Sequence, residues 1–209
     1  MVLNGEYKLA KYGQWDGYRE GVGADILKFL RDEFNREKFI KGLQQLKPVT
    51  DAEYKALWNA CGADPNSDMV TMDVSAKFQK AHPELSRDPS GGEVLRIIQA
   101  GKAKYSNPNI SFAADSLFCE WAYVVDLDKN TFEIYEGFNE TPLDPSERFA
   151  GVPLEKESGR KREYYQVRLL KSYSLRRLPT VETMLRVPSF SSRRQRAKKQ
   201  AEKNNLVAA

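Results

Sequence analysis

Residues 117–138, LFCEWAYVVDLDKNTFEIYEGF, contain two runs rich in aromatic and β-branched side chains, joined by Asp-Lys-Asn at 128–130. Such runs favour β-strands, and a short polar connection between them is typical of a hairpin turn. In the second run Glu133 and Glu136 stand among apolar residues, which indicates one buried and one solvated face. The sequence therefore predicts a β-hairpin over residues 118–138.

The middle third of the chain, ahead of this hairpin, predicts helices. Thr50 and Glu53 have the spacing of a helix N-terminal capping box, and Gly62 marks a C-terminal stop. Ser90 and Glu93 form a second box for a helix that ends at Gly101. Apolar residues at helical spacing predict further helices within residues 24–34, 36–46 and 74–82.

Shorter elements are expected at the two ends of the chain. EYKLAKYGQ (6–14) alternates between apolar and polar residues, which favours a strand that enters the glycine-rich stretch WDGYREGVG (15–23). YYQVRLLKSYSL (164–175) alternates in the same way, and PTVETMLR after it predicts a helix with Pro179 at its first position.

Strands and helices that are segregated along a chain favour an α+β fold with an antiparallel sheet. We expect one domain over residues 1–190, with a mobile loop at 139–163, and a basic flexible tail over 191–209. Residues 193–203 alone carry six Lys/Arg and one Glu, a balance of +5, against +4 for the whole chain. The rest of the chain is therefore close to neutral, and its overall charge does not indicate a nucleic-acid-binding fold.

Composition excludes several classes of protein. Apolar runs extend over only a few residues, far short of the roughly 20 that a transmembrane helix needs. The N-terminal residues lack the pattern of a secretory signal, so we expect the protein in the cytoplasm. Two cysteines and one histidine argue against a disulfide framework and against a zinc site, and no cofactor is expected.

The stretch YGQWDGYREGVG (12–23) is the first candidate site, because a strand, a glycine-rich bend and a helix N-terminus can together hold an anion. Trp15 and Tyr18 can stack on a flat ring, and Arg19 can pair with a phosphate. The candidate ligand-binding residues are Gln14, Trp15, Asp16, Tyr18 and Arg19, with Glu120 added if its strand is a neighbour. The alternative is a tight turn whose two large rings fill the core.

Other candidates have weaker support. Cys119 is expected to be a buried thiol, and a nucleophilic pair would require His82 to reach Cys61 or Cys119. Asp126 and Asp128 flank a turn, where carboxylates are commonly solvated. The basic tail lacks an aromatic residue, so any contact with nucleic acid is expected to be nonspecific.

The motif YGQWDGY (12–18), together with CEWAYVVDLDKNTFEIYEGF (119–138), resembles a family of uncharacterised bacterial and bacteriophage proteins. The resemblance covers most of residues 1–138, although a proline often stands where this chain has Arg19. It implies a context and a fold but no catalytic residue. The layout is also similar to N-terminal-nucleophile hydrolases, which need Cys, Ser or Thr at the processed N-terminus, whereas this chain begins MVLNGEY.

These features favour a binding protein for an anionic, nucleotide-like ligand. The resemblance suggests a phage counter-defence protein that sequesters a signalling nucleotide. An amide or ester hydrolase is one alternative. A module that docks on a host protein is the other.

Overall fold

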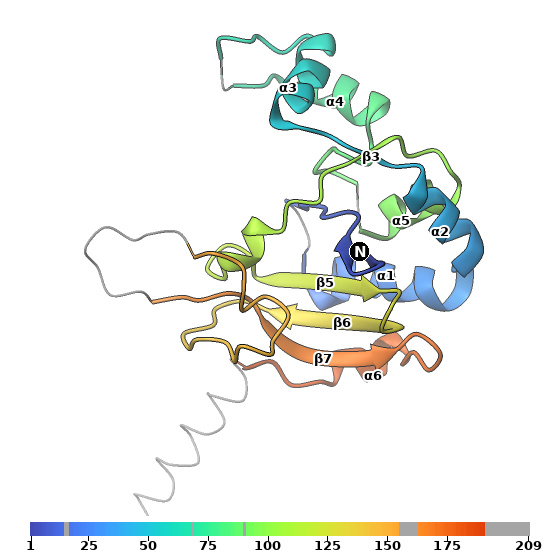
Figure 1. Ribbon diagram of the computed structural model, residues 1–209, viewed down its shortest axis with the longest axis vertical. Helices are drawn as coiled ribbons and strands as arrows, with labels where there is room; N and C mark the ends of the chain where they lie inside the picture. The colour runs from blue at the N-terminus through green and yellow to red at the C-terminus, as the bar shows by residue number, and fades with distance from the viewer. Residues whose placement is uncertain (15–16, 68, 90, 155–162, 191–209) are drawn as a thin grey trace, which may run out of the picture.

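The computed structural model describes residues 1–14, 17–67, 69–89, 91–154 and 163–190 (Figure 1). Its main sheet contains five strands in the order β2-β1-β5-β6-β7. The strands are β1 (Val2–Leu3), β2 (Glu6–Tyr7), β5 (Trp121–Asp126), β6 (Thr131–Glu136) and β7 (Arg168–Ser174). Only β1 and β5 pair in parallel, so the sheet is mostly antiparallel and the predicted α+β class is confirmed.

The predicted hairpin is confirmed as β5 and β6, which pair from Trp121 opposite Glu136 to Asp126 opposite Thr131. The turn places Asn130 in the left-handed region, at φ 57°. Asp126 Oδ1 accepts hydrogen bonds from the backbone N–H groups of Asp128 (3.0 Å) and Lys129 (2.8 Å). These contacts are local, which explains why the sequence predicts the turn.

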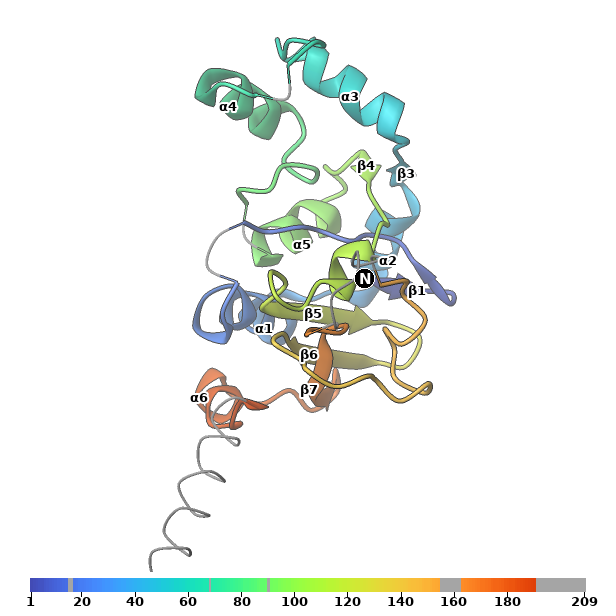
Figure 2. The same ribbon diagram turned by 90° about the vertical axis from the view of Figure 1, so that its left-hand side faces the viewer.

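Helices cover one face of this sheet and stack away from it (Figure 2). The helices are α1 (Ala24–Lys28), α2 (Arg36–Gln44), α3 (Asp51–Ala60), α4 (Met72–Ala81), α5 (Gly91–Gln99) and α6 (Val181–Leu185). Two π-helical turns, Arg19–Gly23 and Phe29–Glu33, flank α1, and a 3-10 turn covers Ser111–Ala114. Strands β3 (Lys47–Pro48) and β4 (Tyr105–Ser106) form a small parallel sheet between α2 and the α3–α4 pair. No helix among the described residues has the length and hydropathy that crossing a bilayer requires.

The ends of the helices mostly follow the predicted capping signals. At Thr50 and Glu53 both hydrogen bonds of the capping box are present, at 3.2 and 2.8 Å, and Gly62 has φ +102°. Ser90 lies outside the described residues. At α6 the prediction is wrong by two positions: the helix begins at Val181, Thr180 is the N-cap, because its hydroxyl accepts the N–H of Thr183, and Pro179 precedes it.

The N-terminal strand is shorter than predicted. β1 and β2 form a tight hairpin through Asn4 and Gly5, both at positive φ, and regular pairing ends at Tyr7. Beyond it the backbone bonds to other coil segments, with the N–H of Ala10 donating to the Asn107 carbonyl at 2.8 Å. Extended residues 8–14 therefore leave the sheet and cross toward the helices.

The second face of the hairpin is also covered, which corrects the predicted mobile loop. Residues 139–154 pack on this face, where Phe149 is 3% exposed and its ring lies 4.8 Å from that of Tyr135. Residues 155–162 lie outside the described part of the chain. The coil packs because it carries apolar side chains that reach the sheet. Its Pro and Gly content predicts a loop and gives no sign of this packing.

The predicted solvated state is wrong for Asp126 and for the glutamates of β6 for the same reason, whereas Asp128 is exposed as expected. Asp126, Glu133 and Glu136 are buried beneath the covering segments. The Arg148 guanidinium contacts Asp126 Oδ2 at 2.6 Å and Glu133 Oε2 at 2.7 Å, and Glu136 Oε2 accepts the backbone N–H of Phe190 at 2.8 Å. Buried carboxylates require such partners.

This buried charge cluster gives a first prediction. Arg148→Met should lower the free energy of unfolding by about 3–5 kcal/mol, because two carboxylates lose their cation while they remain buried. Urea denaturation measures the change. The matched control is Arg186→Met, which breaks the exposed Arg186–Glu182 pair and should have little effect. Equal effects of the two substitutions would contradict the assignment.

The same cluster predicts a dependence of stability on pH. Burial alone would raise the pKa of Asp126 and of Glu133, but hydrogen bonds that include those from Arg148 hold both pKa values below their usual range. Their contribution is therefore present above about pH 4, the range of the unfolded carboxyls, and is lost as the pH falls through the folded pKa values. The stability difference between the protein and Arg148→Met should shrink between pH 7 and pH 3 in urea titrations.

Candidate functional site

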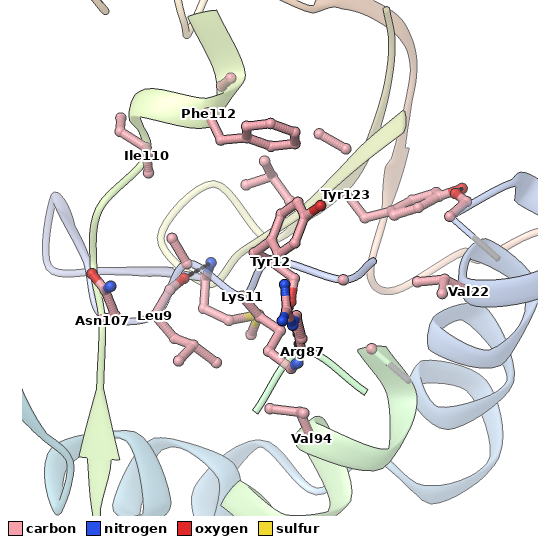
Figure 3. Close-up of a pocket in the computed structure, with 18 of the residues that line it drawn as sticks. Leu9, Lys11, Tyr12, Val22, Arg87, Val94, Asn107, Ile110, Phe112 and Tyr123 are labelled. Atoms are coloured by element: carbon pink, nitrogen blue, oxygen red, sulfur yellow. Dashed lines mark hydrogen bonds between the residues drawn. The ribbon is translucent and has the colours of Figure 1, made fainter. Parts of the chain in front are cut away.

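A cavity of about 930 Å³ lies beside β5, and residues from both faces of this strand line it (Figure 3). Its floor is β5, through Trp121 and Tyr123, and its walls come from α1 and α5. Residues 9–13, 85–89 and 107–113 also contribute to the lining, as do Tyr54 and Trp58 of α3, Tyr7 and Phe149. Pockets of this size, largely apolar with a few polar groups, commonly bind small molecules.

The glycine-rich stretch forms part of the cavity wall, because hydrogen bonds fix it over β5. The hydroxyl of Tyr123 donates to the Gly17 carbonyl at 2.9 Å. A Cβ at Gly23 would stand 2.8 Å from that hydroxyl, so the close approach requires glycine there. Gly17 and Gly21 line the cavity, which leaves its edge free of bulky side chains.

Two aromatic rings stand at the rim of the cavity. Tyr12 and Phe112 pack edge to face, with ring centroids 5.0 Å apart and an interplanar angle of 88°. Tyr12 is 47% exposed and Phe112 is 37% exposed. Both rings therefore present surface that a planar ligand can contact.

Lys11 and Arg87 supply positive charge beside these rings, and they come together with Tyr12 in the cavity (Figure 3). The Lys11 ammonium donates to the carbonyls of Ser86 and Tyr12. Burial lowers the pKa of Lys11 to about 8, although the carboxylates of Asp88 and Glu93 oppose this effect. Lys11 is therefore still mostly charged at neutral pH and titrates in an accessible range.

An acidic group on the opposite wall is already engaged. Asp25 Oδ2 accepts a hydrogen bond from the backbone N–H of Gly92 at 3.1 Å, and Asp25 Oδ1 forms an ion pair with Arg96 Nη1 at 3.2 Å. A Cβ at Gly92 would stand 2.4 Å from Asp25 Oδ2, so this contact needs glycine at the start of α5. The pairing reduces the negative potential that an anionic ligand would meet.

The structure does not bring the predicted ligand residues together as one set. Trp15 and Asp16 lie outside the described residues. Gln14 and Tyr18 are exposed, and neither lines the cavity. Glu120 is exposed just before β5, also away from the lining.

Arg19 has a structural contact instead of an open position. It is 9% exposed, and its Nη1 donates to the carbonyls of Val187 (2.5 Å) and Met184 (3.4 Å) at the C-terminal end of α6. The guanidinium also lies 5.1 Å from the Trp121 ring centroid. Arg19 therefore ties α6 to the glycine-rich stretch, and it does not line the cavity.

Cys119 is buried, as expected, and lines the cavity. Burial raises the pKa of its thiol to about 12, so the reactive thiolate is scarce at neutral pH. The His82 ring contacts the rings of Phe78 and Tyr105. No contact described for the resolved ranges joins this histidine to a cysteine, and the same ranges contain no group of three or more His, Cys, Asp or Glu side chains arranged to hold a metal ion.

The cavity residues that sequence reasoning missed are Lys11, Arg87 and Phe112, while Tyr12 lies in the predicted stretch 12–23 but was not named as a ligand contact. Lys11 directly precedes the stretch 12–23, and a lysine beside it was a usable signal. Arg87 and Phe112 come from coil segments far along the chain, where no local pattern marks them.

Comparison with known proteins finds no matching family model, no matching curated protein and no matching solved structure. The family resemblance of the YGQWDGY motif therefore stays a prediction. The case for a site comes from the geometry of this chain.

The lowered pKa of Lys11 can be tested by competitive acetylation. Its reaction rate with acetic anhydride should level off above about pH 8, because the amine is then deprotonated. Ordinary exposed lysine amines, with pKa near 10.4, should still gain reactivity up to about pH 10. Peptide mass spectrometry at several pH values separates the profiles, and a Lys11 profile identical to those of exposed lysines would contradict the burial of this amine.

Proposed function

We propose that the protein binds a small anionic molecule with a flat ring in this cavity, and that its main role is binding. The observation that carries the proposal is the convergence of Lys11 and Arg87 with the exposed ring pair of Tyr12 and Phe112 at one cavity. Rings contact the planar part of such a ligand, and the cations pair with its phosphate or carboxylate.

A nucleotide or a nucleotide-like metabolite combines these two chemical features. The cavity volume of about 930 Å³ accommodates a mononucleotide and leaves room for a larger ligand. Sequestration of a signalling nucleotide, as the motif resemblance suggests, is one biological use of such a site.

Binding is favoured over hydrolysis by the state of the candidate nucleophile. Burial keeps the Cys119 thiol in its protonated form, and His82 is occupied by aromatic neighbours. A hydrolase needs a nucleophile beside a base that activates it. The hydrolase alternative would therefore require groups outside the set described above.

The proposal predicts a difference between two tyrosines of the same stretch. Tyr12 and Tyr18 are similarly exposed, at 47% and 53%, but only Tyr12 lines the cavity. Isothermal titration over mono-, di- and cyclic nucleotides should identify a ligand whose affinity falls about tenfold in Tyr12→Ala and is unchanged in Tyr18→Ala. A ring contact worth about 1–3 kcal/mol gives a loss of this order.

Two further measurements complete the test. Arg87→Ala should weaken the same ligand and reduce the salt dependence of its binding, because one charge contact is lost. Mass spectrometry of small molecules retained by the purified protein widens the search beyond nucleotides. If no anionic ligand binds, or if Tyr18→Ala weakens binding as much as Tyr12→Ala, the cavity is not the site.

A further inference from the structure

The net positive charge of the chain is concentrated in β7, α6 and the residues around and after them. Residues 164–209 contain eleven Lys/Arg and two Asp/Glu, a net charge of +9, so residues 1–163 carry −5 of the total of +4. No acidic residue occurs from 164 to 181, the segment that contains β7. Such asymmetry between the parts of a chain indicates a polyanionic partner.

Exposed aromatic rings gather at one end of the sheet, where β5 and β7 begin and β6 ends (Figure 1). Phe118 is 71% exposed and Phe138 is 42% exposed. The rings of Phe138 and Tyr164 lie 6.3 Å apart at 73°. Large apolar side chains that remain exposed together mark interaction sites more often than scattered ones do.

The backbone of Phe138 adds an independent observation. Its φ is +50°, a left-handed conformation that bulky residues rarely adopt. The N–H of Phe138 donates to the Ser116 carbonyl at 2.7 Å, so the conformation is fixed by the fold. Because the ring is exposed, hydrophobic burial does not offset the backbone strain. Residues with such strain often serve a function.

The basic residues of β7 begin at the same place. Arg168 pairs with Glu136 in register and donates one hydrogen bond to the Pro142 carbonyl at 3.1 Å, which leaves other guanidinium N–H groups for a ligand. Lys171 follows on the exposed part of the strand, and Arg176 and Arg177 are exposed just beyond its end. Among the described strands β7 pairs only with β6, so its outer edge has no strand partner.

We propose that this aromatic end of the sheet and the exposed cations of β7 and of the residues after it bind single-stranded nucleic acid. The rings of Phe118 and Phe138 stack on unpaired bases, and the cations along β7 contact the phosphates that follow. The seven residues of β7 extend over about 23 Å, long enough to follow several nucleotides.

Single-stranded nucleic acid fits better than other polyanions. Duplexes hide the faces of their bases, whereas single strands present them to aromatic side chains. Proteins that bind an anionic membrane surface typically do so through an amphipathic helix rich in basic residues. Here arginine predominates among the exposed cations of residues 168–177, and its planar guanidinium matches phosphate oxygens.

The test is a fluorescence anisotropy titration of the full chain with labelled oligothymidylate of 15 nucleotides and with the matching duplex. We expect micromolar binding of the single strand at 50 mM salt that weakens strongly at 200 mM, and weaker binding of the duplex. Phe118→Ala should reduce single-strand affinity about fivefold or more without a change in charge. Phe138→Asn should do the same, because asparagine tolerates the left-handed backbone.

Matched controls separate stacking from general effects. Tyr18→Ala removes an exposed ring elsewhere and should leave oligonucleotide binding unchanged. Lys171→Glu with Arg176→Glu should abolish binding, whereas Lys41→Glu with Lys55→Glu, which changes the total charge equally at exposed sites on α2 and α3, should weaken it only slightly. Thermal melting of each variant verifies that the fold is retained.

Removal of residues 191–209 tests the remaining explanation. The truncated protein should bind the single strand more weakly, but Phe118→Ala should still reduce its affinity. Phe118→Ala is chosen because Phe118 is the more exposed of the two rings, so its loss should disturb folding less. Binding that vanishes with the tail and ignores both phenylalanine substitutions would overturn the proposal. So would equal affinity for the duplex, for heparin or for vesicles of anionic phospholipid.

Discussion

Arg148 carries the positive charge that allows the central hairpin to be buried on both faces. Asp126 and Glu133 point into the face opposite the helices, and each contacts the guanidinium within 2.7 Å. The arginine belongs to the coil at 139–154, so the coil can close over the sheet only with its cation in this position. The hydroxyl of Tyr135 completes the cluster with a 2.6 Å hydrogen bond to Glu133. The ring of Phe149, the next residue, stacks 6.5 Å from that of Tyr7, and both rings line the cavity.

The sequence predictions are accurate where the interacting residues lie close together in the sequence, and they fail where those residues lie far apart in it. The capping box of Thr50 and Glu53 and the turn at 128–130 depend on contacts within three residues, and both were predicted. The buried states of Glu133 and Glu136 depend on Arg148 and on the backbone of Phe190, 15 and 54 residues away. Their strand pattern matches a half-solvated face, since the covering segment contributes nothing to local periodicity.

The candidate site shows the same limit. The glycine-rich stretch, predicted as a candidate site, borders the cavity through Gly17 and Gly21. Arg19, by contrast, finds its partners at Met184 and Val187, more than 160 residues away, and no pattern near residue 19 indicates them. The cations beside the cavity are Lys11, one residue before the stretch, and Arg87, in a coil that only the tertiary fold brings close.

The two proposed binding surfaces draw on different kinds of electrostatics. Residues 1–163 carry a net charge of −5, so the average field around the cavity does not attract an anion. Affinity there must come from short-range contacts with Lys11 and Arg87 inside a partly desolvated space, where charge interactions are stronger and salt screens them less. The edge of β7 lies within the part of the chain that carries +9, and its exposed cations act over about one Debye length, roughly 8 Å at physiological salt. Under the two proposals, this segregation of charge lets the cavity select its anion by shape and contact, and it lets a separate edge hold a polymer by its field.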